Sequence, residues 1–293
     1  MRHAILIIAH RNFDHLLYLV NYFDADFDIY IHIDKKSQVT SEELSQFRQL
    51  ERVCGVFQKY TIHWGGYSFL KTIFYLVKQV VVKGGVDYVH LISGADIPTQ
   101  KLDEFKAFFL DKPRYEYLEN FSLPTRNWAG GGFNRLIYYH LHDLLDMRKP
   151  ENMKREHIFV RFQQKWHIRR KISNRLPQFY GGGNWWSLSW ECVNYVVEYT
   201  RKNKRLFKRL RFSFAPDEIY FQTVILNSPF AGNVVGNHMR YIDWRYRNGN
   251  IPANLDLSDF NKVINSFYLF ARKVEFPISM SFVEHLKKIN TLV

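Results

Sequence analysis

Asp217 and Glu218 follow Pro216 in the stretch FAPDEIYFQTVILNS, where apolar residues then recur at helical spacing. A carboxylate held at the start of a rigid helix can act as a general base, which takes a proton from an attacking hydroxyl group. The same residues also make an ordinary helix start, because proline and acidic side chains favour the first turn. The pair alone leaves both interpretations open.

Other polar side chains lie where buried strands are predicted to end. His10 follows the apolar run HAILIIA, Asp34 follows FDIYIHI, and the tetrapeptide SGAD at residues 93–96 follows YVHLI. In open sheets of parallel strands, ligands bind beyond the carboxyl ends of the strands. A carboxylate, a glycine and small hydroxyl groups at this edge indicate a nucleotide site. No G-x-G-x-x-G or Walker pattern follows the first strand, which argues against a dinucleotide or P-loop enzyme.

The elements that must position these side chains alternate between strand and helix patterns. Buried strands are predicted over residues 3–10, 27–34, 53–57 and 86–93, with helical patterns after each of the first three. Strands separated by helices indicate right-handed crossovers. We therefore predict an α/β fold in which a mostly parallel, Rossmann-like central sheet is flanked by helices.

The second half of the chain is less regular. It predicts a strand over 115–120, a loop and helix over 131–146, a glycine-rich turn and aromatic strand over 181–189, a helix after Pro216 and a strand over 238–244. No linker separates the halves. We expect one domain over 1–293, with a nucleotide-binding half at 1–112 and an acceptor-binding and catalytic half at 113–293.

The composition of the 293 residues, with 46% apolar and 17% aromatic side chains, is typical of a globular protein. No run of about 18 apolar residues occurs, so we expect no membrane span. The N-terminal segment reaches His10 too soon for a signal peptide. Only Cys54 and Cys192 occur, which indicates no disulfide framework and fits a reducing compartment.

The formal net charge of +13 is concentrated in two segments, 153–175 and 201–211, where Lys and Arg alternate with aromatic residues. Such segments are either solvated helix faces or interfacial segments that bind an anionic membrane. A nucleic-acid-binding protein is the alternative from another class. It is disfavoured because no helix-turn-helix, zinc-finger or ribonucleoprotein motif occurs, and carboxylates line the expected cleft.

Eight segments together resemble glycosyltransferase family 14, which holds core-2/I-branching β-1,6-N-acetylglucosaminyltransferases and peptide O-xylosyltransferases. In chain order they are AILIIAHRNFDHLLYLV, IYIHIDKKS, IHWGGYS, YVHLISGADIPTQ, GGGNWWSLSWECVNYV, FAPDEIYFQTVILNS, MRYIDW and LFARKVE. The resemblance implies a GT-A-type fold, a nucleotide-sugar donor and inversion at the anomeric carbon. It also implies catalysis without a divalent metal, as in the best-studied branching members.

The resemblance assigns the role of general base to Glu218, with Asp217 bracing the turn. It assigns Arg272 and Lys273, in LFARKVE, to the diphosphate, where fixed cations would do the electrostatic work of a metal. The branching enzymes contribute one more arginine, for which Arg240 is the candidate here.

The remaining donor contacts follow from the strand ends. Ala9 and His10 would border the uracil, and Asp34 would accept hydrogen bonds from the base or ribose, unless it is a helix cap. Trp64 either walls the nucleotide or is a core residue.

The Asp-x-Asp triplet at 24–26 precedes the second strand and is expected to be a solvated turn. Ser93, Gly94 and Asp96 stand where such a motif is expected and are candidate donor contacts. A single carboxylate is a poor Mg²⁺ or Mn²⁺ site. We therefore predict no metal and no cofactor apart from the donor.

On the acceptor side, Glu119 resembles the branching enzymes' sugar-binding glutamate. Trp185 or Trp186 could stack on a sugar, but strand alternation would turn one of them into the core. His140 and His142 are close in sequence, but alternate residues of a helix do not face one another, which argues against a metal site.

The resemblance predicts a UDP-sugar-dependent inverting glycosyltransferase, with UDP-N-acetylglucosamine as donor and UDP-xylose as the alternative. The chain lacks the membrane anchor and cysteine pairs of the mammalian Golgi members. We therefore expect a bacterial, cytoplasmic enzyme of surface polysaccharide synthesis, acting on a glycan or lipid-linked glycan and touching the inner membrane face peripherally. A catalytically silent sugar-binding relative is a further alternative.

Overall fold

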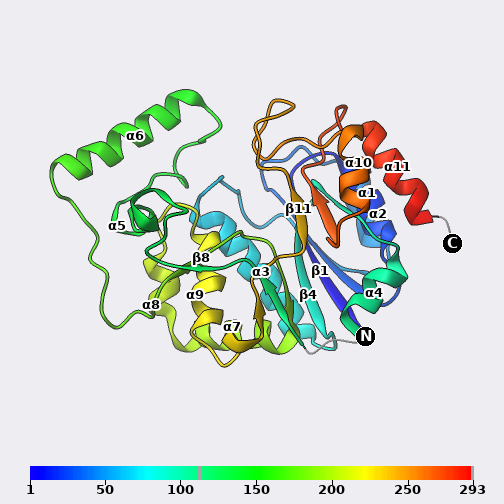
Figure 1. Cartoon of the computed structure of the whole chain (residues 1–293), viewed down its shortest axis with the longest axis horizontal. Coiled ribbons are helices and arrows are strands. Elements are labelled where there is room, and N and C mark those ends of the chain that lie inside the picture. The colour runs from blue at the N-terminus through cyan, green and yellow to red at the C-terminus, as the bar shows by residue number, and fades with distance from the viewer. Residues whose placement is uncertain (111–113, 292–293) are drawn as a thin grey trace.

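Seven strands form the central sheet of the computed structural model, which describes residues 1–110 and 114–291 (Figure 1). The strands are β1 (His3–Ala9), β2 (Phe27–Ile33), β3 (Val53–Phe57), β4 (Tyr88–Ser93), β6 (Glu116–Leu118), β9 (Trp186–Ser189) and β10 (Val234–Val235). Their order is β10-β6-β9-β4-β1-β2-β3. β9 runs antiparallel to β4 and β6, and the other neighbours are parallel. The predicted α/β fold with a mostly parallel sheet is confirmed.

Helices cover both faces of this sheet, and every side chain of β1 is therefore buried. Ala4 and Leu6 face the helices α3 (Tyr67–Lys83), α7 (Trp190–Lys202) and α9 (Tyr220–Leu226). Ile5 and Ile7 face α1 (Phe13–Tyr22), α2 (Ser41–Gln49) and α4 (Leu102–Leu110). Alternate residues of a strand point to opposite faces, so one apolar run supplies two cores.

Local signals place two of these helices as predicted. Thr40 accepts a hydrogen bond from the Glu43 amide, and the Glu43 carboxylate accepts one from the Thr40 amide, which is a capping box at the start of α2. Helix α3 ends at Gly84, whose φ of 65° suits a residue without a side chain.

The helix predicted over 131–146 is largely wrong. The 3-10 turn Ala129–Gly132 leads into α5, which spans only Asn134–Ile137, and the chain is then non-helical as far as Pro150. Tertiary contacts explain the difference, since the amides of His140 and Leu141 bond to the Phe212 carbonyl and the Glu156 carboxylate. These contacts replace the hydrogen bonds that a helix would make.

A second sheet brings the C-terminal region beside the end of β4. It consists of β11 (Arg240–Ile242), β12 (Phe270–Arg272) and β5 (Asp96–Pro98). β12 pairs antiparallel with β5, which sets Arg272 opposite Asp96. A two-stranded sheet of β7 (Phe121–Ser122) and β8 (Tyr180–Gly181) lies beside α9.

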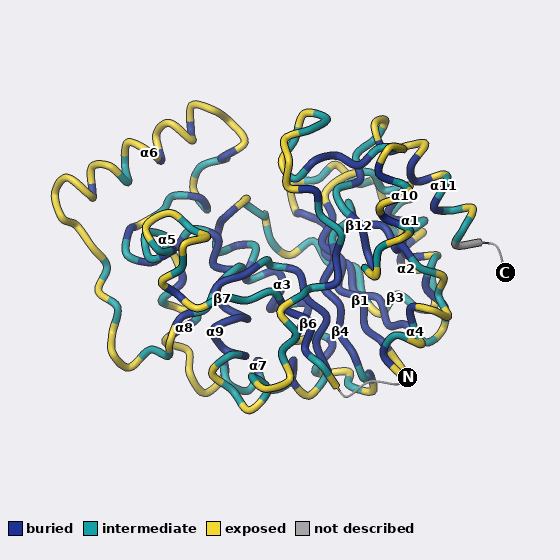
Figure 2. Tube along the Cα trace, in the orientation of Figure 1, coloured by how far each residue is buried: buried dark blue, intermediate teal, exposed yellow. Residues whose placement is uncertain are grey.

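The remaining elements are peripheral. They are α6 (Pro150–Lys165), α8 (Lys204–Arg209), α10 (Phe260–Ile264), α11 (Met280–Thr291) and the 3-10 turns Pro216–Glu218, Ala231–Asn233 and Leu257–Asp259. Helix α6 stands out from the body and exposes most of its surface (Figures 1 and 2). Across 1–110 and 114–291, none of the helices has both the length and the apolar character that a membrane crossing needs. The boundary predicted between residues 112 and 113 lies outside the described residues.

Candidate active site

The ends of the central parallel strands meet at one edge of the sheet. The Asp34 amide donates to the Ala9 carbonyl at 2.9 Å, and the Gly94 amide donates to the Ile8 carbonyl at 2.9 Å. A Cβ on Gly94 would lie 2.9 Å from that of Ala9, so the strands approach closely only because residue 94 is glycine. The structure therefore brings together these residues from β1, β2 and β4.

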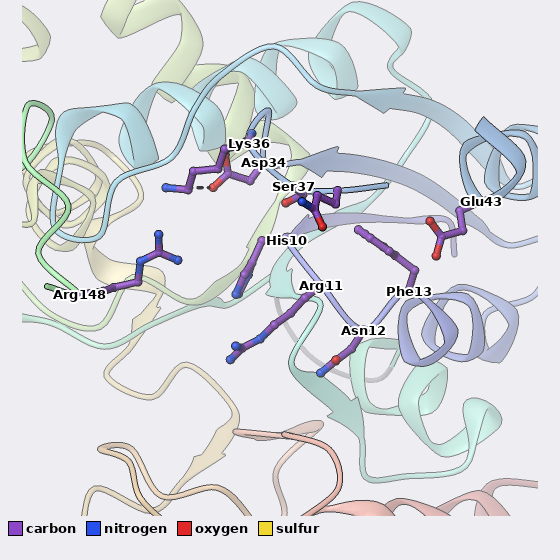
Figure 3. A pocket seen from close by; sticks show the side chains of 10 residues that line it. His10, Arg11, Asn12, Phe13, Asp34, Lys36, Ser37, Glu43 and Arg148 are labelled. Carbon is purple, nitrogen blue, oxygen red and sulfur yellow. Dashed lines mark hydrogen bonds and ion pairs between the residues drawn. The ribbon is translucent and has the colours of Figure 1, made fainter. Parts of the chain in front are cut away.

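A cavity of about 600 Å³ opens at this edge (Figure 3). It is lined by His10, Arg11, Asn12, Phe13, Asp34, Lys36, Ser37, Gln38, Glu43 and Arg148. Asp34 is buried, and its Oδ1 accepts from the amides of Lys36 and Ile62, each at 3.2 Å. Asp34 thus joins the loop after β2 to the loop that carries Trp64, which is a different role from the helix cap considered above.

The rim of this cavity is basic. Burial lowers the pKa of His10 to about 4, and the Arg11 cation contributes in the same direction, so the imidazole is neutral at pH 7. Lys273 and Arg148 lie close enough to lower it further. Burial also lowers the pKa of Lys273. Arg11 pairs with Glu275, two residues beyond Lys273, which holds the C-terminal segment against the cavity.

The acid at the end of β4 is paired with an arginine. Asp96 is buried, accepts a hydrogen bond from the Ser93 amide, and has its Oδ1 3.1 Å from Nε of Arg272. The Asp-x-Asp triplet lies elsewhere, in a turn where Asp24 and Asp26 both pair with Lys106. That triplet is therefore a solvated turn, as predicted.

Trp185 supports Arg272 and is not a platform for an acceptor sugar. Only 4% of Trp185 is exposed, and the Arg272 guanidinium lies over its ring at 4.2 Å. Trp186 is also buried and packs on Phe221. The expectation that one tryptophan would face a ligand is corrected, because Trp185 precedes β9 and strand alternation does not apply to it.

The expectation that Arg240 binds the diphosphate is also corrected. Its side chain is buried, and it donates to Ser187 Oγ at 2.9 Å and to the carbonyls of Leu91 and Trp186 at 3.0 and 2.8 Å. Burial lowers its pKa to about 9. These contacts tie β11 to the central sheet and occupy both terminal nitrogens of the guanidinium, which a bidentate contact to a diphosphate would need.

Glu218 lies on the 3-10 turn Pro216–Glu218, which a break at Ile219 separates from α9. Its Oε2 is 2.6 Å from Nη1 of Arg135, and 31% of its side chain is exposed. Burial raises the pKa of Glu218, while the Arg135 cation opposes that rise. Arg135 is itself held over the ring of Trp128 at 3.6 Å. The carboxylate is thus oriented and still accessible.

Asp217 supports this turn from the interior. It is buried, and burial together with the Glu218 charge raises its pKa to about 8. The side chain of Asn184 opposes the rise through a hydrogen bond. Asp217 is therefore a buried neighbour of Glu218, in agreement with its predicted bracing role.

The glycine run 181–183 connects Glu218 to Glu119. The Gly182 amide donates to the Glu218 carbonyl at 3.0 Å, and the Gly183 amide donates to Glu119 Oε2 at 2.7 Å. A Cβ on Gly182 would lie 2.0 Å from the Glu119 carbonyl oxygen, so only glycine fits there. The two carboxylates are close enough for the Glu119 charge to raise the pKa of Glu218.

A second cavity, of about 340 Å³, opens beside Glu119. Its lining residues are Glu119, Gly236, Asn237, His238, Arg240, Tyr241, Ile242, Trp244 and Tyr268. Burial lowers the pKa of His238 to about 3, and the Arg240 and Arg272 cations contribute to the same effect. His238 therefore lies between Glu119 and the Arg272 region as a neutral side chain.

Trp64 is 63% exposed, which excludes its interpretation as a core residue. Its ring packs on His142 and Phe214, and the neighbouring Gly65 carbonyl accepts from the Ala215 amide at 2.8 Å. Trp64 therefore borders the segment that carries Glu218.

Three residues of the candidate site were not predicted from the sequence: Arg135, His238 and Trp244. Arg135 is 83 residues from Glu218 along the chain, and no local pattern marks it as the partner of a catalytic acid. His238 directly precedes the recognised segment MRYIDW, and Trp244 is the last residue of that segment, so a polar and an aromatic side chain at its two ends were the available signal.

Two curated proteins and one solved structure are among those similar to this chain. Mouse (Mus musculus) xylosyltransferase 1 is 25% identical over 264 residues, which cover 85% of this chain and 25% of that protein. Mouse xylosyltransferase 2 is 26% identical over 313 residues, which cover 98% of this chain and 33% of that protein. The chain thus spans a quarter to a third of the length of these curated relatives. The crystal structure of mouse xyloside xylosyltransferase 1 in its apo form superposes with a TM-score of 0.37 and 10% identity, covering 94% of this chain and 98% of the other.

A family model identifies the class of protein to which this sequence belongs. The chain belongs to the Core-2/I-Branching enzyme family, whose sequence model matches residues 4–264. That match includes the strand ends, Glu119 and Glu218, and it ends before Arg272.

Proposed function

We propose that this protein is an inverting glycosyltransferase in which Glu218 is the general base. The observation that carries the proposal is the Glu218 carboxylate, which is accessible, oriented by Arg135 and linked through the glycine run to Glu119. In the reaction, Glu218 takes the proton of an acceptor hydroxyl as its oxygen bonds to the anomeric carbon. The bond from that carbon to the diphosphate oxygen breaks on the opposite face.

The donor is a UDP-sugar whose nucleotide occupies the cavity at the strand ends. Ala9, His10 and Asp34 border the uridine, as the family resemblance implies, and the basic rim suits the diphosphate. Arg272 and Lys273 stabilise the negative charge that develops on the leaving group. The uridine contacts come from the half at 1–112, while the diphosphate contacts Arg272 and Lys273, together with Glu119 and Glu218, come from the half at 113–293.

The names of the relatives support xylose as the transferred sugar. The two curated relatives described above are both named xylosyltransferases, which supports UDP-xylose ahead of the UDP-N-acetylglucosamine first expected. The family description, which names branching enzymes, supports N-acetylglucosamine as the second candidate.

A glycan is the acceptor that the second cavity suits. Glu119 can accept hydrogen bonds from sugar hydroxyls, and Trp244, which is 64% exposed, offers an aromatic face beside it. The acceptor is either a free or a lipid-linked glycan of a bacterial surface polysaccharide.

Release of UDP from a panel of donors tests the proposal. The purified chain should hydrolyse one UDP-sugar slowly without an acceptor, with UDP-xylose and UDP-N-acetylglucosamine as the primary comparison. Binding of UDP without release from any donor would favour a catalytically silent sugar-binding protein. Binding of short oligonucleotides in place of UDP would favour the nucleic-acid alternative.

Helix α6 is the part of the protein that we propose contacts an anionic membrane from the cytoplasmic side. Its exposed large apolar residues are Met153, Ile158 and Phe162, with Trp166 just beyond its end. Arg161 and Lys165 are exposed on the same side, since residues three and four apart are neighbours on a helix. Apolar and basic side chains together are what binding to an anionic leaflet requires.

A further inference from the structure

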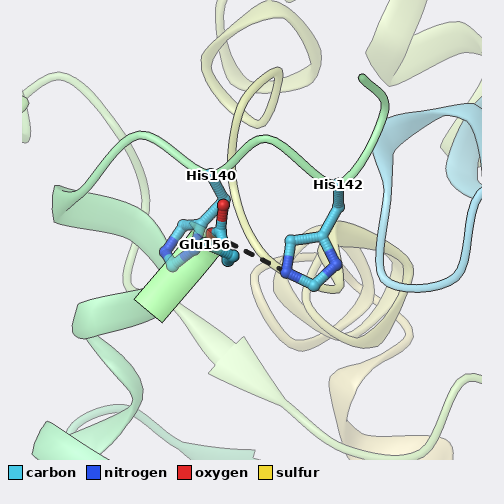
Figure 4. A group of neighbouring side chains, drawn as sticks. All are labelled: His140, His142 and Glu156. Carbon is cyan, nitrogen blue, oxygen red and sulfur yellow. Dashed lines mark hydrogen bonds and ion pairs between the residues drawn. The ribbon is translucent and has the colours of Figure 1, made fainter. Parts of the chain in front are cut away.

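Three side chains from two segments of the chain converge on one another (Figure 4). His140 and His142 lie on the non-helical segment after α5, and Glu156 lies on α6. Nδ1 of His140 is 2.8 Å from Glu156 Oε1, and Nε2 of His142 is 3.8 Å from the same oxygen. All three ligand atoms lie within 4.8 Å of one another, and His142 and Glu156 are buried.

The outward-facing nitrogen of each imidazole is held by a backbone carbonyl. His140 Nε2 is 3.0 Å from the Asn134 carbonyl oxygen, and His142 Nδ1 is 3.0 Å from that of Trp64. A carbonyl oxygen can only accept, so both of these nitrogens carry their protons. The remaining nitrogen of each ring is then available as a lone-pair donor. Histidines that bind metals are usually fixed in this way by a carbonyl or carboxylate.

Glu156 is oriented by the same segment. Its Oε2 accepts from the Leu141 amide at 3.0 Å, which leaves Oε1 directed between the two histidines. Residues 140 and 142 do not lie on a helix, so the helical spacing that argued against a metal site does not apply to them. Asp143 takes no part, because its carboxylate accepts from the amides of Tyr67 and Ser68 at the start of α3.

We propose that His140 Nδ1, His142 Nε2 and Glu156 Oε1 bind one Zn²⁺ ion, with water in the fourth position. Two ligands at about 2.0–2.1 Å from a tetrahedral zinc lie about 3.3 Å apart. Two of the observed separations, 2.8 and 3.8 Å, bracket that value, and the two histidine nitrogens lie within 4.8 Å of each other, so the side chains would draw together on binding.

The role of this ion is structural and does not depend on the proposed sugar transfer. The residues that α6 buries are Asn152, Glu156 and Gln163, all polar, so no apolar core fixes the helix. Zinc would fasten α6 to the segment before it. Through the His142 bond to the Trp64 carbonyl, it would also fix the loop that borders Glu218.

Calorimetric titration of ZnCl₂ into the chelator-treated full chain tests the site. All proteins should carry Cys54→Ser, because that exposed thiol is itself a possible zinc ligand. One saturable site is expected. His142→Gln and Glu156→Gln should bind at least about 100-fold more weakly, since losing even an outer partner of a ligand costs 10- to 100-fold.

His157→Gln is the matched control, because His157 neighbours Glu156 on α6 but is exposed, and it should bind zinc like the parent. Thermal melting separates lost ligands from lost fold: zinc should raise the Tm of the parent and of the His157 variant and leave that of His142→Gln unchanged. Absence of saturable binding to the parent, or equal affinity in the His142 variant, would overturn the site. Neither result would bear on UDP release.

Discussion

Arg272 and Asp96 face each other across the paired strands β12 and β5, with Nε of the arginine 3.1 Å from Oδ1 of the aspartate. In metal-dependent enzymes of the GT-A type, the acid at this position helps to hold a divalent cation. Here a guanidinium already lies against it, supported by Trp185 at 4.2 Å. A fixed cation costs no reorganisation when charge develops on the leaving group.

Arg272→Gln should weaken UDP binding by about 10- to 100-fold, because a hydrogen bond to a charged group contributes about 1.5–3 kcal/mol. Calorimetric titration with UDP measures the effect. Arg201→Gln, which removes an exposed arginine on α7, is the control and should bind UDP normally. Added Mg²⁺ or Mn²⁺ should not accelerate UDP release by the wild-type chain. A requirement for Mn²⁺ would contradict the assignment of the diphosphate to fixed cations.

Glu218→Gln should reduce transfer by about 10²- to 10⁴-fold, which is the usual contribution of a general base. The affinity for UDP should stay unchanged, because the amide keeps the shape of the side chain. Steady-state transfer rates and UDP titrations together make the test. Glu284→Gln, an exposed substitution on α11, serves as the reference. Full turnover by the Glu218 variant would remove the residue from its role.

Arg135→Gln should shift the pH profile of kcat/KM. The base must be ionised, so the rate falls as the pH drops through the pKa of Glu218, which burial has raised. Loss of the nearby cation raises that pKa further, and the acid limb should therefore move to higher pH. Arg126→Gln, an exposed change in the preceding loop, should leave the limb in place. An unchanged limb in the Arg135 variant would show that another group controls the profile.

Asp217→Asn should stabilise the protein progressively as the pH rises. The pKa of Asp217 is about 8 in the folded protein against an ordinary 3.8, so the folded state holds this proton more tightly. That stabilisation is complete below the ordinary value and is lost as the pH rises toward 8. Melting at pH 5 and pH 9 should show the variant gaining about 2 °C or more at the higher pH.

The exposed Glu51→Gln should show no such pH dependence. An equal effect of Asp217→Asn at both pH values would mean that the buried acid is ionised throughout.

Reversal of two charges on α6, Arg161→Glu with Lys165→Glu, should weaken sedimentation with anionic liposomes at least tenfold. Each basic residue near such a surface contributes about 1 kcal/mol. Lys262→Glu, exposed on α10, is the control for net charge. Equal loss in the control, or binding insensitive to salt, would argue against docking through α6.

Local patterns in the sequence predicted the strands of the first half of the chain and the helix starts between them. Thr40 and Glu43 are three residues apart and make their capping box without help from the rest of the fold. The continuous apolar run at β1 predicted a strand buried on both faces, and all its side chains are buried. These features depend on neighbours along the chain, which a sequence displays directly.

The site was harder to predict because its partners come from distant segments. Arg135 reaches Glu218 across 83 residues, and Glu156 reaches His140 across 16. Arg240 matched the chemistry of a phosphate ligand, but it is buried where carbonyl groups take its donors. The sequence shows the type of each residue, but it does not show which distant group will be that residue's hydrogen-bonding partner.

Gly182 restricts how the positions of Glu119 and Glu218 can be altered. Its contact with Glu119 leaves no room for a side chain, and its amide bonds to the Glu218 carbonyl, so one short loop joins the two carboxylates. Movement of either glutamate is transmitted to the other. Under the proposed roles, a substitution at Glu119 is expected to change acceptor selectivity and transfer rate together, whereas a substitution at Trp244 is expected to change acceptor selectivity alone.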